Sequence, residues 1–181
     1  LHDGGTLGLF QVEEIAARTR ALGMQGHVAV SHAYGLGDIP ADTLLKAGEM
    51  LAAAGVAIMT NAPGNHAFPP VAALRQAGVT VFSGSDNIRD SWWPYGDGDM
   101  LSRANLIGYR SGFYEDWELA SAFDVVSYAG AKALGLEGYG IAVGAKADFV
   151  AMEAHHVPEA VVAVPKGRTV YRAGKQVRTC S

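Results

Sequence analysis

Apolar and polar positions in the first half of the chain alternate in a repeated order of helix and strand. Apolar residues at helical spacing predict helices over residues 9–22, 40–54 and 70–77. Short apolar runs, each following a glycine that ends the preceding helix, predict buried strands at residues 28–30, 56–59 and 79–82. The order indicates an α/β fold with repeated units.

Each predicted strand is followed by polar residues, namely His32, Thr60 with Asn61, and Asp86. The loops after the strands are long, whereas the helix-to-strand junctions are tight glycine turns. This asymmetry is typical of a (β/α)8 barrel, whose active site is built from the loops at the C-terminal ends of the strands. Taken alone, an aspartate in a Ser/Gly-rich turn, such as Asp86, is more often a solvated turn residue than a catalytic one.

The second half of the chain changes character. Helical spacing continues over residues 100–112 and 117–134, and short strands are predicted at residues 148–152, 160–164, 169–171 and 175–178. We therefore assign residues 1–138 to part of a barrel and residues 139–181 to the strands of a small β-sandwich.

Composition narrows the class of protein. With 49% hydrophobic and 18% charged residues among 181, the chain can form a packed core. A net charge of −4 argues against nucleic-acid and anionic-membrane partners, and no apolar run is long enough for a membrane span. One cysteine, Cys180, fits a reducing, cytoplasmic compartment. Charged residues on the first helix predict a solvated face: Glu13, Glu14, Arg18 and Arg20.

Five residues at strand ends or in loops could carry chemistry: His2, Asp3, His32, His66 and Asp86. Histidine and carboxylate side chains at neighbouring strand ends can bind a divalent metal, which lowers the pKa of bound water to about 7. The simpler interpretations are a buried structural histidine for His32, loop structure for His66, and a surface turn for His155 and His156. The adjacent Trp92 and Trp93 suit the wall of a site for a planar substrate.

Three segments resemble the amidohydrolase superfamily, namely Ser31–Ala33, Ser85–Asp90 and Pro94–Met100. The segment Tyr139–Val150 is similar to the one that re-enters the small β-sandwich of that family. The nearest branch is the cytosine deaminase-like one, and within it the string at Ser85–Asp90 is most similar to members acting on s-triazines.

The resemblance implies the C-terminal half of a metal-dependent (β/α)8 barrel plus part of a small β-sandwich. It implies that Asp86 is a metal ligand and base, that His32 lies beside the metal, and that Asp3 is an acid that shuttles protons. Substrate contacts are expected from Asn87, Trp92 and Trp93. The expected cofactor is one divalent metal ion, zinc first, with iron and manganese as alternatives.

The implied reaction is hydrolytic deamination or dealkylamination of a planar nitrogen heterocycle, an s-triazine such as N-isopropylammelide or a cytosine-like pyrimidine. The His-x-His pair of the family's first strand is absent from this sequence. The alternative hypothesis is therefore an inactive or noncatalytic barrel fragment that needs a complementary N-terminal half. Assembly into a homo-oligomer is a further expectation.

The beginning of the chain allows two alignments with the family's fifth strand, which ends in a ligand histidine followed three residues later by an acid. If His2 is the ligand, the acid position falls on Gly5, which has no acidic group. If Asp3 is the acid, the ligand precedes Leu1. We prefer the second alignment because it continues without a gap to His32.

Overall fold

The computed structural model describes residues 1–180, which form two compact units, Leu1–Gly98 and the chain from Asp99 onward. The two units are considered separately below. Among the described residues, no helix combines the length and apolar character needed to cross a membrane. The assignment of residues 1–138 and 139–181 to a barrel part and a β-sandwich stays a prediction.

The first unit is built on a three-stranded parallel sheet of β1 (Val28–Ser31), β2 (Val56–Met59) and β3 (Val81–Phe82), in that order. Ser31 of β1 pairs with Met59 of β2, and Met59 pairs with Phe82 of β3, so the three strands end level with one another. The predicted strands are therefore confirmed, although β3 is two residues shorter than expected.

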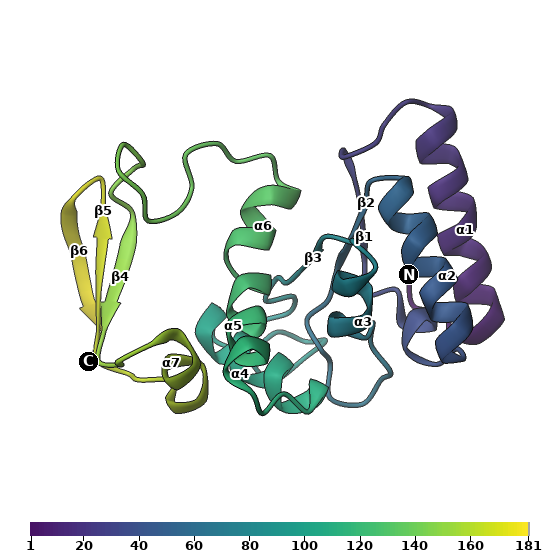
Figure 1. Ribbon diagram of the computed structural model, residues 1–181. Helices are drawn as coiled ribbons and strands as arrows, with labels where there is room; N and C mark the ends of the chain where they lie inside the picture. The colour runs from purple at the N-terminus through teal and green to yellow at the C-terminus, as the bar shows by residue number, and fades with distance from the viewer. Residues whose placement is uncertain (181) are drawn as a thin grey trace. The chain divides into compact units, whose positions relative to one another are not determined.

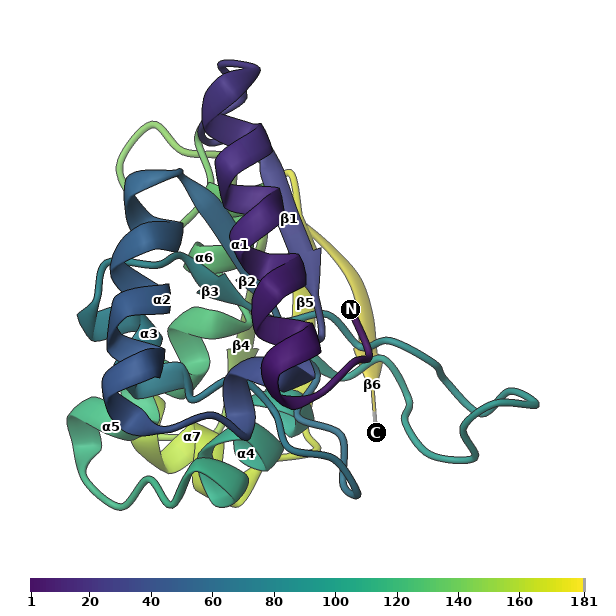
Figure 2. The same cartoon turned by 90° about the vertical axis from the view of Figure 1, so that its right-hand side faces the viewer.

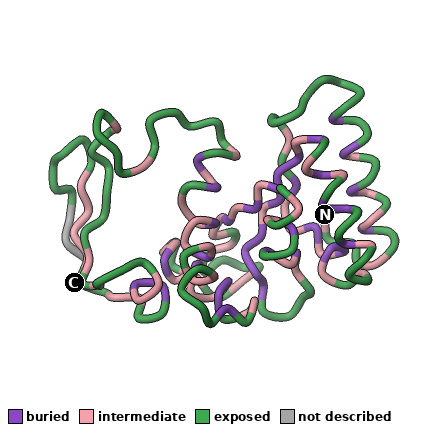
Figure 3. Tube along the Cα trace, in the orientation of Figure 1, coloured by how far each residue is buried: buried purple, intermediate pink, exposed green. Residues whose placement is uncertain are grey.

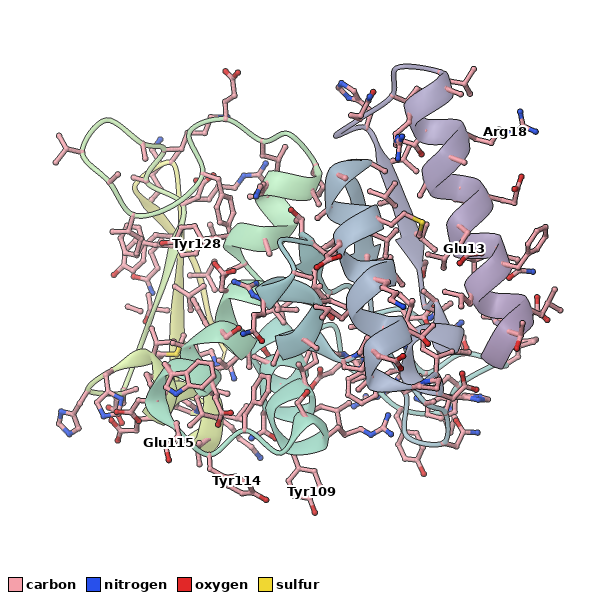
Figure 4. All side chains as sticks on the ribbon, turned by 45° about the vertical axis from the view of Figure 1, so that its right-hand side comes forward. Glu13, Arg18, Tyr109, Tyr114, Glu115 and Tyr128 are labelled. Carbon is pink, nitrogen blue, oxygen red and sulfur yellow. The ribbon has the colours of Figure 1, made fainter. Side chains whose placement is uncertain are left out.

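Helices α1 (Gly5–Ala21) and α2 (Ala41–Ala53) lie side by side along one side of this sheet, as Figures 1 and 2 show from two directions. The short helices η1 (Tyr34–Gly37) and α3 (Val71–Gln76) follow β1 and β2. Buried residues follow the strands and the inner sides of the helices (Figure 3). On α1, Glu13, Glu14, Arg18 and Arg20 are exposed, and Arg18 points outward from the helix (Figure 4), which confirms the predicted solvated face.

Helix α1 begins at Gly5, four residues before the predicted start at residue 9. The extra turn contains Gly8, whose low helix propensity argues against a helix at this point. Gly8 is buried, and a Cβ added there would lie 3.0 Å from the Cα of Gly35. Close packing of the helix on η1 requires a glycine here and outweighs its low propensity.

Over its described residues, 99–180, the second unit combines four helices with an antiparallel sheet in the order β4 (Phe149–Met152), β5 (Arg168–Arg172), β6 (Lys175–Cys180). Its helices are α4 (Met100–Ser111), α5 (Asp116–Val125), α6 (Tyr128–Ala133) and α7 (Val157–Ala163). A small core joins α4 to α7 through four buried side chains: Leu101, Ala104, Ala160 and Val161.

The strand predicted at residues 160–164 is wrong, because these residues lie in and just after α7. The side chain of His156 accepts a hydrogen bond from the Glu159 amide and caps the helix, and a proline stands in its first turn. His155 and His156 are exposed in the turn before the helix, as predicted.

The single helix predicted over residues 117–134 is also wrong, because the structure has α5 and α6 with a break at Val126 and Ser127. The Ser127 hydroxyl donates to the Phe123 carbonyl at 2.7 Å. Such local side-chain bonding offers the backbone an alternative to continuing the helix.

Asp99 and Arg168 form a partly buried ion pair within the second unit, with Nη1 and Oδ1 2.6 Å apart. Asp99 also caps α4, since its carboxylate accepts from the Leu101 amide and the Ser102 hydroxyl. Burial acts to raise the pKa of Asp99, but the hydrogen bonds from Arg168 and Ser102 outweigh it, so the pKa lies below its ordinary value.

Replacing Asp99 with Asn should lower the free energy of unfolding by about 1.5–3 kcal/mol at neutral pH, because a part-buried charged hydrogen bond is lost. Since the folded pKa is depressed, this contribution is present above the unfolded pKa and disappears as the pH falls through the folded pKa. Urea unfolding from pH 7 down to acid pH should show the two proteins converging. Glu137→Gln removes an exposed carboxylate of the same unit and serves as the control; an equal loss in that variant would contradict the assignment.

Candidate active site

The ends of the three parallel strands bring His32, Asn61 and Asp86 together. The Nε2 of His32 lies 3.7 Å from Oδ2 of Asp86. Asn61 donates a hydrogen bond from Nδ2 to the same Asp86 oxygen at 2.8 Å. His32 and Asp86, which follow different strands in the sequence, thus face each other at one edge of the sheet.

Four residues without the freedom of glycine adopt left-handed backbone conformations at these strand ends. Their φ angles are 69° for His32, 46° for Ala33, 49° for Ala62 and 57° for Asp86. Each such conformation costs on the order of 1–3 kcal/mol and persists where surrounding contacts enforce it. Strain gathered at one edge of a sheet is typical of a functional site.

His32 is the more buried member of the pair, with 13% of its side chain exposed against 31% for Asp86. Burial lowers the pKa of His32 below its ordinary value, and the nearby Asp86 charge offsets this only in part. The imidazole is therefore neutral at pH 7, the form that binds metals. Within the described residues its buried Nδ1 has no hydrogen-bond partner.

Two aromatic rings lie beside His32, and a third packs on one of them. The ring centroids of His2 and Tyr34 lie 4.8 Å and 5.2 Å from that of His32. His66 stacks on Tyr34 at 4.8 Å with nearly parallel planes. Burial and the charge of Asp86 raise the pKa of Tyr34. His66, predicted as loop structure, lies in a loop and stacks on Tyr34.

The turn that carries His32 and Tyr34 is held against α1 by Gly8 and Gly35. A Cβ on Gly35 would lie 2.9 Å from the Cα of Gly8, closer than real Cβ contacts allow.

Asp3 precedes α1, is exposed, and accepts a hydrogen bond from Gln11 Nε2 at 2.7 Å. Its role as the acid stays a prediction.

The loop after Asp86 is organised by Asp90. One oxygen of Asp90 accepts from the Trp92 and Trp93 amides at 2.9 Å each, and the other accepts from Asn87 Nδ2 at 2.6 Å. The Trp93 ring packs edge-on against Tyr95, whereas the Trp92 side chain is exposed. The substrate roles predicted for Asn87, Trp92 and Trp93 stay predictions.

His32 and Asp86 fit part of a metal site. Imidazole nitrogen and carboxylate oxygen both bind zinc, and ligand atoms about 2.1 Å from a tetrahedral metal lie about 3.4 Å apart, close to the separation seen here. In the portion of the chain that the structure describes, no group of three or more His, Cys, Asp or Glu residues could hold a metal ion. His32 and Asp86 would therefore supply two ligands of suitable chemistry to such a site, and the other ligands would come from groups outside the described residues.

The protein family of this chain follows from its similarity to known proteins. A family model described as the amidohydrolase family matches residues 1–178. The chain belongs to the amidohydrolase family. Its likeness to the family, seen in Ser31–Ala33 and Ser85–Asp90, is thereby confirmed, as is the α/β fold of part of a barrel.

Among curated proteins, the chain is 32% identical over 176 residues to N-isopropylammelide isopropyl amidohydrolase of Pseudomonas sp. (strain ADP), covering 97% of this chain and 44% of the relative. The crystal structure of N-isopropylammelide isopropylaminohydrolase from Burkholderia multivorans matches with a TM-score of 0.95 and 43% identity, covering 99% of this chain and 46% of that one. The 5-methylcytosine deaminase from Klebsiella pneumoniae, liganded with 5-fluorocytosine, matches with a TM-score of 0.82 and 26% identity, covering 92% and 44%. The chain spans less than half the length of each.

Two contacts of the site have only weak signals in the sequence. Asn61 follows a predicted strand, but its bond to Asp86 depends on the left-handed turns at Ala62 and Asp86. Tyr34 is an aromatic residue two positions after a strand-end histidine, which could have marked it as a neighbour of the site.

Gly35→Ala should push η1 away from α1 and lower the free energy of unfolding by about 1–3 kcal/mol, the usual cost of overpacking. Chemical denaturation of the two proteins measures the difference. The matched control is Gly64→Ala in an exposed loop, where an added Cβ meets nothing within 4 Å. Equal stability of the Gly35 variant and the wild type would show that the close approach is not required.

Proposed function

We propose that the protein containing this chain is a metal-dependent hydrolase that removes an amine or alkylamine from a planar nitrogen heterocycle. The observation that carries the proposal is the convergence of His32 Nε2 and Asp86 Oδ2 at the C-terminal strand ends of a chain of the amidohydrolase family. The names of two similar proteins favour an s-triazine such as N-isopropylammelide, and the 5-methylcytosine deaminase makes a cytosine-like pyrimidine the second choice.

His32 and Asp86 would hold the metal, a divalent ion for which zinc is our first choice and iron or manganese the alternatives. When bound, such an ion supplies a water molecule with a pKa low enough to make it a nucleophile at neutral pH. The remaining ligands would come from groups outside the described residues, because these contain no three-ligand cluster.

The chain's own residues would move the protons. Asp86 accepts a proton from the attacking water, whose oxygen forms a bond to the amine-bearing ring carbon. Asp3, starting protonated, gives its proton to the ring nitrogen, takes up the hydroxyl proton of the resulting adduct and passes it to the departing amine as the bond between amine and carbon breaks. The proton held by Asp86 then restores Asp3 through solvent. The neutral imidazole of His32, 3.7 Å from the Asp86 carboxylate, orients the water or the substrate.

The substrate ring would lie against the aromatic loop. Trp92 is 79% exposed and so is available as a wall for a planar ring. Trp93 is held by its contact with Tyr95. Asn87 donates to Asp90, but its amide has a second N–H and a carbonyl oxygen for the edge of a heterocycle.

Replacing Asp86 with Asn in the full-length protein should lower turnover by roughly 10²–10⁴-fold, because the amide cannot accept the proton of the attacking water. Release of isopropylamine from N-isopropylammelide and of ammonia from cytosine measures the effect in zinc-loaded protein. The matched control is Asp42→Asn, an exposed carboxylate in the first turn of α2. Turnover of Asp86→Asn within about tenfold of wild type would rule out this mechanism.

The alternative function is a noncatalytic fragment that needs a complementary N-terminal half as its partner. It is favoured by the described residues, which contain no group of three or more candidate metal ligands. Homo-oligomer formation, a cytoplasmic location, and the expectation of neither nucleic-acid nor membrane partners stay predictions from the sequence.

We expect the 181-residue chain expressed alone to self-associate and to turn over neither heterocycle, because a partial barrel exposes strand edges. Size-exclusion chromatography and chemical unfolding of this chain provide the measurement. Co-expression with the upstream segment of a full-length relative should restore a well-behaved species. A monomer that unfolds cooperatively on its own would count against the need for a second half.

A further inference from the structure

We infer that Asn61 is a positioning residue that fixes the Asp86 carboxylate in the orientation required for its work. The inference deepens the proposed function and rests on it, because that function gives Asp86 its role as ligand and base. It assigns a role to the end of β2, which contributes an amide but no titratable group to the site.

The contact itself is direct and protected. Asn61 is only 9% exposed, and its Nδ2 donates to Oδ2 of Asp86 at 2.8 Å. An ionised carboxylate can only accept, so the amide must present its N–H groups to it. A hydrogen bond to a charged acceptor in a shielded place is roughly twice as strong as a neutral one.

Asp86 needs such a restraint because of where it stands. It has a left-handed φ of 57° at the start of a long loop, and its side chain is about one-third exposed. The His32 Nε2 at 3.7 Å lies beyond hydrogen-bond distance, whereas Asn61 Nδ2 lies within it. The orientation of the carboxylate therefore depends on the amide from the neighbouring strand.

Asn61 can act as a restraint because the backbone around it is fixed. The preceding Thr60 is fully buried, and its amide donates to the Phe82 carbonyl at 3.0 Å. Its hydroxyl accepts from the amide of Ala62 at 3.1 Å. Asn61 is thus held from both sides, and the amide extends from a rigid turn.

The test uses Asn61→Leu, which keeps the branched shape and removes the donor, and Asn61→Ala as a second, smaller variant, both in the full-length protein. Zinc affinity, measured by chelator competition, should fall about 10–100-fold, as is usual when a partner of a metal ligand is lost. With a substrate that the wild type hydrolyses, kcat should fall while KM stays within about threefold. Asn65→Leu, in the exposed part of the same loop, is the matched control and should leave all three quantities unchanged.

A double-mutant cycle separates positioning from general damage to the fold. In an Asp86→Ala background, Asn61→Leu should have no further effect on zinc affinity, because the group through which it acts is gone. Persistence of the full loss in that background would overturn the inference. So would wild-type zinc affinity and kcat, within about twofold, in the folded Asn61 variants, even if their melting temperature were lower.

A crystal structure of Asn61→Ala gives a readout that requires neither turnover nor metal. Displacement of the Asp86 carboxylate from its wild-type position supports the inference, and an unmoved carboxylate overturns it. If the wild type hydrolyses none of the heterocycles, the proposed function fails, while the zinc measurements and the crystal structure still decide the role of Asn61.

Discussion

The parallel, level pairing of β1, β2 and β3 is the constraint on which the site depends. The ladder continues one residue beyond the strands, since His32 N donates to the Met59 carbonyl and Thr60 N donates to the Phe82 carbonyl. The residues that come next therefore emerge from the same edge of the sheet. A slip of one residue in either pairing would send a side chain to the opposite face and take His32 away from Asp86.

Much of this arrangement could be predicted from the sequence because burial leaves a pattern. The apolar runs that end at Ser31, Met59 and Phe82 mark the strands, and the polar residues after them mark the edge at which they end. A short apolar run is ambiguous on its own, however. Residues 160–164 could belong to a strand or a helix, and the deciding contacts lie outside the run, at His156 and Glu159.

The contacts within the site were harder to predict, because they depend on turn conformations that no periodicity encodes. The stacking of His66 on Tyr34 brings a loop together with the start of η1, far from it in the sequence. The bond between Asn61 and Asp86 likewise depends on left-handed residues of types that rarely adopt that conformation. The roles of His32 and Asp86 stay proposals, and the similar proteins are more than twice as long as this chain.

The left-handed backbone at His32 and Asp86 has a consequence for selection. Glycine adopts such angles without a steric penalty, so glycine at either position would relieve strain and at the same time remove the imidazole or the carboxylate. At these two positions, backbone strain and the proposed chemistry favour different residues. A search for more heat-resistant versions of this protein that ignored activity would thus be drawn toward changes that abolish the activity proposed above.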